Sequence, residues 1–240
     1  MTAEVPLGYA NRTGRPRGIL TRGLGLVLPG VRAVNAQVEP YADAWARHNA
    51  AALTTSGRRW VVLGDSMSQG IGASAWDAGW VDQAQERLRS EGHDLVVVNL
   101  SSTGARTRDL LDQQLPVLRA LPSADSPVPD LVTVMIGSND LFAGAGSRRR
   151  LPDDFAEMVG LLPRGSVVAT LPQPRAAARA ANRHLEQASA RGDLTVVDMR
   201  SEGPSSWSGR LASDFFHPND AGYAEIAAAF VPHLRAATLR

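Results

Sequence analysis

Three residues of this chain have the types and spacing that nucleophilic catalysis requires. Ser66 follows a Gly-Asp pair at the end of a short apolar run, residues 60–63, and Asp214 stands three positions before His217 near the C-terminus. A serine hydroxyl becomes a nucleophile when a histidine takes its proton and a carboxylate fixes the tautomer of that histidine. Because a single turn can present Asp214 and His217 together, the three residues predict acyl transfer through a serine.

Acyl transfer also needs hydrogen-bond donors for the oxyanion of its tetrahedral intermediate. Gly104 and Asn139 lie in polar stretches that each follow a further apolar run. The candidate donors are the backbone N–H groups of Ser66 and Gly104 and the side-chain amide of Asn139. A glycine suits such a position because the backbone must come close to the substrate.

The elements that must position these residues alternate along the chain. The apolar runs predict strands at 60–63, 95–100, 131–136, 167–171 and 194–197. Helical patterns occupy 31–52, 80–89, 106–118, 153–162, 175–191 and the stretch from about 219 onward. This alternation predicts an α/β fold, a three-layer α/β/α sandwich around a five-stranded parallel sheet. Since ligands of such folds bind at the carboxyl ends of the strands, we expect the candidate residues to meet there.

Two stretches have less regular patterns. Pro40 interrupts the first helical stretch, so either this helix kinks or a second helix begins there. The glycine-rich residues 142–150 end in three arginines and predict a mobile loop. Together with 72–80 and 200–213, this loop is expected to shape the substrate pocket. We divide the chain into an N-terminal arm and helix, residues 1–56, and a catalytic domain, residues 57–240.

Composition narrows the functional classes. The chain has 240 residues and a formal net charge of +1, which gives no general case for binding nucleic acid. It contains no cysteine and no lysine, which excludes disulfides, thiolate metal sites and lysine Schiff bases. No apolar run approaches the roughly 20 residues of a membrane-spanning helix, and no convincing signal peptide is present, so a cytoplasmic location is expected.

The N-terminal arm is basic. In residues 1 to about 30, four arginines are opposed only by Glu4, namely Arg12, Arg15, Arg17 and Arg22. The arm either lies on the domain or makes weak contact with an anionic membrane surface or a partner.

Several other polar and aromatic residues have plain structural interpretations. Asp65 and Asp140 are each expected to hydrogen-bond the backbone of their own loop. The tryptophans at 60, 76, 80 and 207 either pack in the core or on the surface, which is the preferred interpretation for each, or include walls of the pocket. Four further histidines stand alone and predict no metal site, namely His48, His93, His184 and His233.

Four sequence blocks resemble, in order, the signature blocks of the SGNH or GDSL hydrolase superfamily. The blocks are Gly64-Asp65-Ser66, Gly104, Gly137-Ser138-Asn139-Asp140 and Asp214-Phe215-Phe216-His217-Pro218. The resemblance covers about residues 59–232 and implies the flavodoxin-like fold of that superfamily. It also implies Ser66 as nucleophile, His217 as base and Asp214 as its orienting acid. Gly104 and Asn139 would complete the oxyanion hole, with no cofactor and no metal.

The resemblance predicts a GDSL-type serine esterase or lipase that acts on a small-molecule acyl ester. An acyl-enzyme on Ser66 would form and be resolved by water. The same triad would serve an acyltransferase or a carbohydrate deacetylase, and the sequence does not separate these alternatives. A non-catalytic module that binds an acyl group or a glycan predicts a broken triad, whereas all three residues are present.

Overall fold

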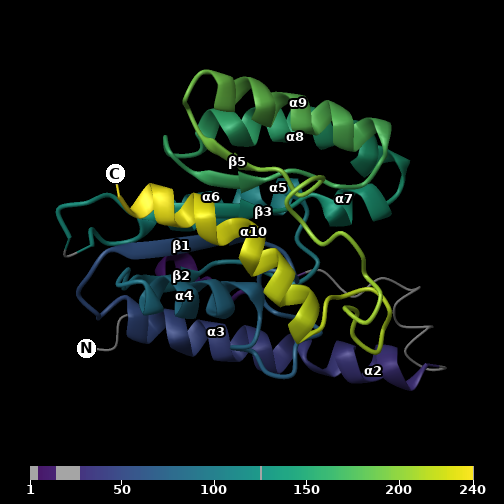
Figure 1. The fold of residues 1–240 in the computed structure, drawn as a ribbon, viewed down its shortest axis with the longest axis horizontal. Coiled ribbons are helices and arrows are strands. Elements are labelled where there is room, and N and C mark those ends of the chain that lie inside the picture. The colour runs from purple at the N-terminus through teal and green to yellow at the C-terminus, as the bar shows by residue number, and fades with distance from the viewer. Residues whose placement is uncertain (1–4, 15–27, 125, 240) are drawn as a thin grey trace.

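A single parallel sheet forms the centre of the protein in a computed structural model, which describes residues 5–14, 28–124 and 126–239. Its strands are Arg59–Gly64 (β1), Val96–Asn99 (β2), Leu131–Met135 (β3), Val167–Ala169 (β4) and Thr195–Val197 (β5). They lie in the order β2-β1-β3-β4-β5, which is the flavodoxin-like order (Figure 1). The predicted five-stranded parallel sheet is therefore confirmed.

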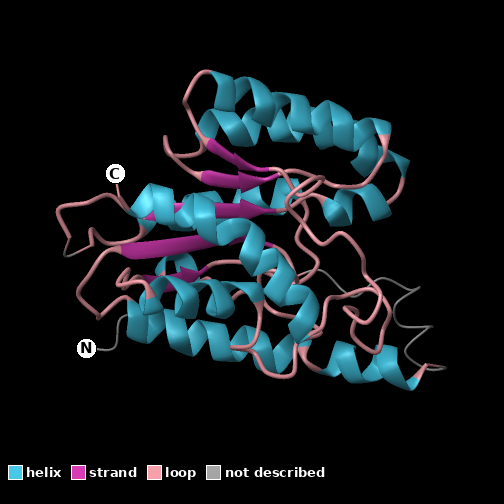
Figure 2. Cartoon of the chain, in the orientation of Figure 1, coloured by secondary structure: helices cyan, strands magenta, loops and turns pink. Residues whose placement is uncertain are grey.

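Helices cover both faces of the sheet (Figure 2). The N-terminal part holds a 3₁₀ turn, Pro6–Gly8 (η1), and the helices Pro29–Ala36 (α2) and Val38–Ala52 (α3). Between the strands lie Trp80–Ser90 (α4), Thr107–Asp109 (α5), a π-helical turn Leu110–Gln114 (η2), Leu115–Ala120 (α6), Ser138–Phe142 (α7), Ala145–Leu161 (α8) and Ala176–Ala190 (α9). The chain ends with Asp220–Thr238 (α10). These layers confirm the predicted α/β/α sandwich.

The two halves of the core follow the alternation of side chains along each strand. Val61 and Leu63 point into the apolar layer beneath η2, α8 and α9. Trp60 and Val62 point the other way, into the layer beneath α4 and α10. β1 is buried along its whole length, as expected of a central strand in a parallel sheet. The residues that follow β1 therefore leave a rigid support.

The first helical stretch is two helices rather than one kinked helix. α3 begins at Val38, so Pro40 lies in its first turn, where a missing backbone N–H leaves no intrahelical bond unmade. Tyr41 and Trp45 are buried by this helix. The sequence left open whether the helix kinks at Pro40 or a second helix begins there, and the structure shows that a second helix begins there.

The prediction of a mobile loop at 142–150 is wrong. Phe142 ends α7, and α8 already begins at Ala145, eight residues before the predicted start of the helix. Leu151 and Phe155 are fully buried, and this apolar stripe holds the helix on the sheet. The three arginines from 148 to 150 belong to the first turns of α8, where helix geometry directs polar residues away from the core.

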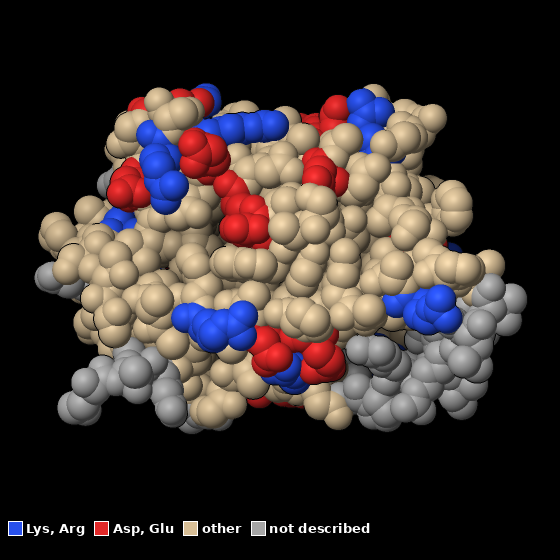
Figure 3. Space-filling model, turned by 90° about the horizontal axis from the view of Figure 1, so that it is seen from below, with Lys and Arg blue, Asp and Glu red and all other residues tan. Residues whose placement is uncertain are grey.

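Charged side chains are interspersed on the face that α2 and α3 form. Figure 3 shows basic side chains beside acidic ones on this face, with wide uncharged areas between them. Arg12 donates to Glu39 at 2.8 Å and to Asp43 at 2.7 Å, so its charge is balanced by α3. The other arginines of the basic arm, 15, 17 and 22, lie outside the described residues. In the described part of the chain, no helix has the length and apolar character needed to cross a membrane.

Trypsin should test the helical assignment of 145–161. Because α8 holds the peptide bonds after Arg148, Arg149 and Arg150 in a packed helix, we expect limited trypsin digestion to leave them intact. Phe155→Ala removes a fully buried ring, which typically costs about 3–5 kcal/mol, and should expose the same bonds. Mass spectrometry of the fragments measures both results. Rapid cleavage at these arginines in the wild-type protein would contradict the assignment.

Candidate active site

Ser66, His217 and Asp214 form a continuous chain of hydrogen bonds. The Oγ of Ser66 lies 3.0 Å from Nε2 of His217, and Nδ1 of His217 lies 2.6 Å from Oδ2 of Asp214. A carboxylate at Nδ1 requires that this nitrogen carry a proton, which leaves Nε2 as the acceptor for the serine hydroxyl. The three residues are thus placed as proton transfer from a serine to a histidine requires.

The loop that carries Ser66 is held by the strand end before it. A Cβ on Gly64 would lie 2.6 Å from the carbonyl oxygen of Met135 in β3, so only glycine fits there. The side chain of Gln114 accepts from Gly64 N at 2.9 Å and donates to Gly64 O at 2.8 Å. Because Gln114 is fully buried in the π-helical turn, this pairing fixes the end of β1 two residues before Ser66.

A tight turn presents Asp214 and His217 together. Oδ1 of Asp214 accepts from the backbone N–H groups of Phe216 and His217, each at 3.0 Å. Phe215 between them has a φ of 55°, a left-handed conformation that is strained for a bulky residue and costs about 1–3 kcal/mol. The Asn219 side chain caps α10 directly after this turn. The turn is therefore held by its own hydrogen bonds and by the helix that follows.

These hydrogen bonds decide the charge of Asp214. Burial works to raise its pKa, but the hydrogen bond from His217, the charge of that histidine and the two backbone N–H groups together lower it. Asp214 is thus held as a carboxylate, which accepts the hydrogen bond from Nδ1 of His217.

The candidate oxyanion donors lie on neighbouring loops. The Asn139 side chain, in the first turn of α7, donates to the carbonyl oxygen of Ala105 at 2.9 Å. This contact ties Asn139 to the residue that follows Gly104. Gly104 has a φ of 77°, which a residue with a Cβ rarely adopts, so the turn that presents its N–H needs glycine. Asn139 and Ser66 both line the same cavity.

Arginines hold the far end of the short helix α7. Arg148 of α8 donates to the carbonyl oxygens of Leu141 and Ala143, and Arg175 also donates to Leu141 O. Carbonyl groups at a helix C-terminus lack intrahelical partners, and cations are favourable there. The helix that carries Asn139 is therefore supported at its C-terminal end by residues from two other segments.

The two aspartates that neighbour the site residues differ in their contacts. Asp65 accepts from Met67 N at 3.0 Å, which confirms the expected bond within its own loop. Asp140 instead accepts from the backbone N–H of Thr107 at 2.9 Å, so the expectation of a bond within its own loop is wrong. The reason is spatial, since the loops after β2 and β3 lie side by side at the sheet edge. Burial raises the pKa of Asp140.

Asp65 is the more unusual of the two. It is 2% exposed, and burial raises its pKa to about 7, with the hydrogen bond from Met67 opposing the rise. Its second oxygen lies 3.3 Å from the Asn139 amide nitrogen. A carboxyl group thus sits behind the nucleophile with few donors to stabilise its charge.

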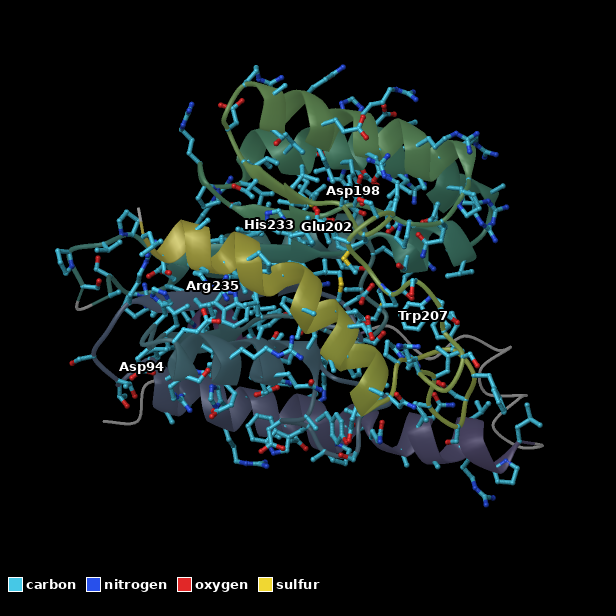
Figure 4. All side chains as sticks on the ribbon, viewed as in Figure 1. Asp94, Asp198, Glu202, Trp207, His233 and Arg235 are labelled. Carbon is cyan, nitrogen blue, oxygen red and sulfur yellow. The ribbon has the colours of Figure 1, made fainter. Side chains whose placement is uncertain are left out.

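A cavity of about 420 Å³ opens beside Ser66. Besides Ser66, Asn139 and His217, its walls are largely apolar and include Met135, Ala169, Leu171, Met199, Leu211 and Ile226. Trp207 lines it from the long connection between β5 and α10 (Figure 4), so for this tryptophan the structure has the pocket wall rather than the preferred packing in the core or on the surface. Of the three segments expected to shape the pocket, 200–213 contributes several residues, 142–150 contributes only Phe142, and 72–80 contributes none.

The mouth of this cavity is aromatic. Phe142, Phe215 and Phe216 line the cavity and are at least half exposed. Phe142 and Phe216 contact each other edge to face with ring centroids 5.5 Å apart. Phe216 also contacts the ring of His217. Exposed aromatic side chains that gather at the mouth of a cavity are typical of a surface that binds apolar ligands.

The remaining histidines do not gather at a metal site. Within the described ranges, no group of three or more histidine, aspartate and glutamate side chains is placed to hold a metal ion. His233 of α10 pairs with Glu202 at 2.6 Å, and Figure 4 shows both side chains near Asp198. His48 donates to the carbonyl oxygen of Val97.

Some residues at the site escaped sequence analysis. Gln69, Gln114 and Asn99 are buried amides whose side chains hold the loops around Ser66 and Gly104. Nothing in the sequence marks them, because a glutamine or asparagine in an apolar context has many possible partners.

Comparisons with known proteins identify a family to which this chain is similar. The model of the GDSL-like Lipase/Acylhydrolase family matches residues 62–225. Esterase TesA of Pseudomonas aeruginosa is 38% identical over 84 residues, which are 35% of this chain and 38% of that protein. The match therefore spans well under half of the curated relative.

Solved structures share the fold. A crystal structure of TesA superposes with a TM-score of 0.57 and 25% identity, covering 75% of this chain and 99% of that chain. The crystal structure of the esterase EstA from Pseudoalteromonas sp. superposes with a TM-score of 0.56 and 19% identity. The superposition covers 77% of this chain and 100% of that chain. A family 3 carbohydrate esterase from Clostridium thermocellum superposes with a TM-score of 0.57 and 18% identity, covering 75% of this chain and 98% of that chain.

Asp65→Asn should reveal the buried carboxyl group through the pH dependence of stability. The folded pKa of about 7 lies above that of an unfolded aspartate, so the neutral form stabilises the fold at low pH, and this contribution is lost as pH rises through 7. Asparagine stays neutral throughout. The variant should therefore gain roughly 3 kcal/mol relative to wild type between pH 5 and pH 8.

Urea unfolding at the two pH values measures this gain. Asp94→Asn serves as the control, because the Asp94 side chain is 84% exposed and points away from the ribbon in Figure 4. A gain for Asp65→Asn that does not change with pH would show that the carboxyl group is ionised throughout this range.

Proposed function

This chain belongs to the GDSL-like lipase/acylhydrolase family, and we propose that it hydrolyses carboxylic esters through an acyl-enzyme on Ser66. The observation that carries this proposal is the hydrogen-bonded chain from Ser66 through His217 to Asp214 at the wall of an apolar cavity. A serine that only capped a helix or closed a turn would need neither the histidine nor the carboxylate behind it.

In the proposed first half of the reaction, Oγ of Ser66 attacks the ester carbonyl carbon while His217 Nε2 takes the hydroxyl proton. The carbonyl oxygen becomes an oxyanion, which the N–H groups of Ser66 and Gly104 and the amide of Asn139 stabilise. Asp214 stabilises the imidazolium that has formed. His217 then gives the proton to the leaving alkoxide, and the alcohol departs from the acyl-enzyme.

The second half repeats these steps with water. His217 takes a proton from a water molecule, whose oxygen attacks the acyl carbon. The tetrahedral intermediate collapses, and the same proton returns to Oγ of Ser66 as the carboxylic acid leaves. Of the protein groups, this reaction sequence uses the three side chains and the oxyanion donors.

We place the acyl chain of the substrate in the apolar part of the cavity. Met135, Met199 and Ile226 lie there beside Leu171 and Leu211. Methionine side chains adapt to irregular apolar ligands because they are unbranched and flexible. Each buried methylene group contributes about 0.8 kcal/mol, so the walls favour an ester whose acyl chain is longer than acetyl.

A series of p-nitrophenyl esters from acetate to palmitate tests the activity and the acyl site together. Wild type should hydrolyse them, with kcat/KM rising by up to about fourfold per added methylene until the cavity is filled. Ser66→Ala should reduce hydrolysis to background. Ser90→Ala, at the exposed end of α4, is the matched control and should stay fully active. Full activity of Ser66→Ala in pure protein would refute the proposed mechanism.

Asp214→Asn tests the role of the carboxylate. The new amide keeps an oxygen for the N–H groups of Phe216 and His217 but places an NH₂ group against Nδ1 of His217. The histidine must then carry its proton on Nε2, where it cannot accept from Ser66. We expect kcat to fall by about 10⁴ with little change in thermal stability. A kcat within tenfold of wild type would remove Asp214 from the proposed triad.

A further inference from the structure

The outer edge of β2 is hydrogen-bonded by side chains rather than by another strand. Among the residues that the structure describes, β2 pairs only with β1 and is the last strand of the sheet. On its free edge, Asn49 of α3 accepts from Asn99 N at 2.8 Å and donates to Asn99 O at 2.7 Å. His48 donates to Val97 O at 3.2 Å. Residues before the sheet thus satisfy a strand edge that would otherwise present unpaired backbone groups.

The side chain of Asn11 makes further hydrogen bonds to the backbone at the end of β2 and just after it. Its amide nitrogen donates to Asn99 O at 2.7 Å and to Ser101 O at 2.9 Å, and its amide oxygen accepts from Asn49 at 3.2 Å. The residue is 1% exposed and has a φ of 56°, a left-handed conformation that asparagine tolerates better than most residues. Every donor of this buried amide is therefore used, and its conformation is held by contacts far away in the sequence.

Gln69 links the backbone of Asn11 to two loops of the site. Its amide nitrogen donates to Asn11 O at 3.0 Å. Its oxygen accepts from the backbone N–H of Thr103 at 2.7 Å and from the Thr103 hydroxyl at 2.5 Å. Gln69 is fully buried and lies three residues after Ser66, while Thr103 directly precedes Gly104. One side chain thus spans the N-terminal segment, the nucleophile loop and the loop of the oxyanion donor.

We propose that Asn11 is a positioning residue for catalysis, which acts through Gln69 to hold the N–H of Gly104 at its place relative to Ser66. This inference rests on the proposed function. Both Asn11 and Asn49 precede residues 62–225, the region that matches the family model. The N-terminal segment accordingly supplies part of the catalytic apparatus, in addition to covering the sheet edge.

The expected effect lies in kcat. An oxyanion forms only on the way to the transition state, so a displaced donor slows the chemical step without weakening substrate binding. Loss of one donor costs about 10²–10³ in rate, and a displacement of about 1 Å costs up to 10². A loosened Gly104 loop should therefore lower kcat by roughly 10- to 100-fold while KM changes by less than about threefold.

Asn11→Gly is the direct test, because glycine adopts the same φ without strain and removes only the amide. Its matched control is Asp130→Ala, which breaks the two hydrogen bonds between Asp130 and the buried Arg59 at the amino end of β1, opposite to Ser66. Both variants should lose thermal stability. Only Asn11→Gly should lose kcat on the best p-nitrophenyl ester, and only it should speed hydrogen exchange at the Thr103 amide.

A pair of variants at Thr103 addresses the same connection with little risk to folding. Thr103→Val keeps the shape of the side chain but removes the hydroxyl that donates to Gln69, whereas Thr103→Ser retains it. We expect Thr103→Val to lower kcat several-fold and Thr103→Ser to keep the kcat of the wild type. The pH profile of both variants should match that of the wild type, because amides and hydroxyls do not titrate in this range.

The outcomes separate this inference from the proposed function. Hydrolysis that survives Ser66→Ala would reject the function itself. In a Ser66-dependent enzyme, wild-type kcat in Asn11→Gly and Thr103→Val would overturn the positioning role alone. An equal loss of kcat in Asp130→Ala would also overturn it, since the effect would then follow from general destabilisation.

Discussion

Parallel pairing of the strands is the constraint on which the candidate site depends. Val62 of β1 pairs with Asn99 on one side and with Thr133 on the other, so the three strands end nearly level. Parallel strands all point their carboxyl ends to one edge, and the loops that follow them must leave there. Ser66, Gly104 and Asn139 are therefore neighbours although they are separated by long stretches of sequence. The turn that holds Asp214 and His217 lies at the same edge of the sheet, because His217 is hydrogen-bonded to Ser66.

Polar loops packed against a buried sheet need hydrogen-bond partners, and here several of these partners are neutral amides. Gln114 pairs with the backbone of Gly64, and Asn49 with that of Asn99. An amide both donates and accepts, so it can replace a strand partner without bringing a charge into the interior. The family model begins at residue 62, yet much of this pairing comes from residues before it. In this chain the described part of the N-terminal segment is hydrogen-bonded to the loops of the candidate site.

Two aspartates near Ser66 show how the number of donors sets the charge of a carboxyl group. Asp214 receives the histidine and two backbone N–H groups, and its pKa falls despite partial burial. Asp65 receives one backbone N–H and a long contact from Asn139, and burial raises its pKa to about 7. The carboxylate proposed to stabilise an imidazolium is thus the one with the richer set of donors. Residue type alone does not distinguish the two.

The sequence by itself determined the order of strands and helices along the chain and the residues at the strand ends. It also determined which side chains are of the types that acyl transfer requires. These follow from local patterns: apolar runs, glycines after strands, and a short spacing between Asp214 and His217. Local patterns failed at 142–150, where glycines and arginines favoured a loop. Burial of Leu151 and Phe155 against the sheet outweighs the low helix propensity of the glycines there.

Only the tertiary structure decided the contacts between segments that are distant in the chain. It placed Trp207 in the cavity wall, directed Asp140 to Thr107 instead of its own loop, and joined Asn11 to Gln69. The physical reason is that hydrogen bonds and apolar contacts act over a few ångströms in space. An amide or an indole is compatible with many partners, and its actual partner depends on which loops the sheet brings within that distance.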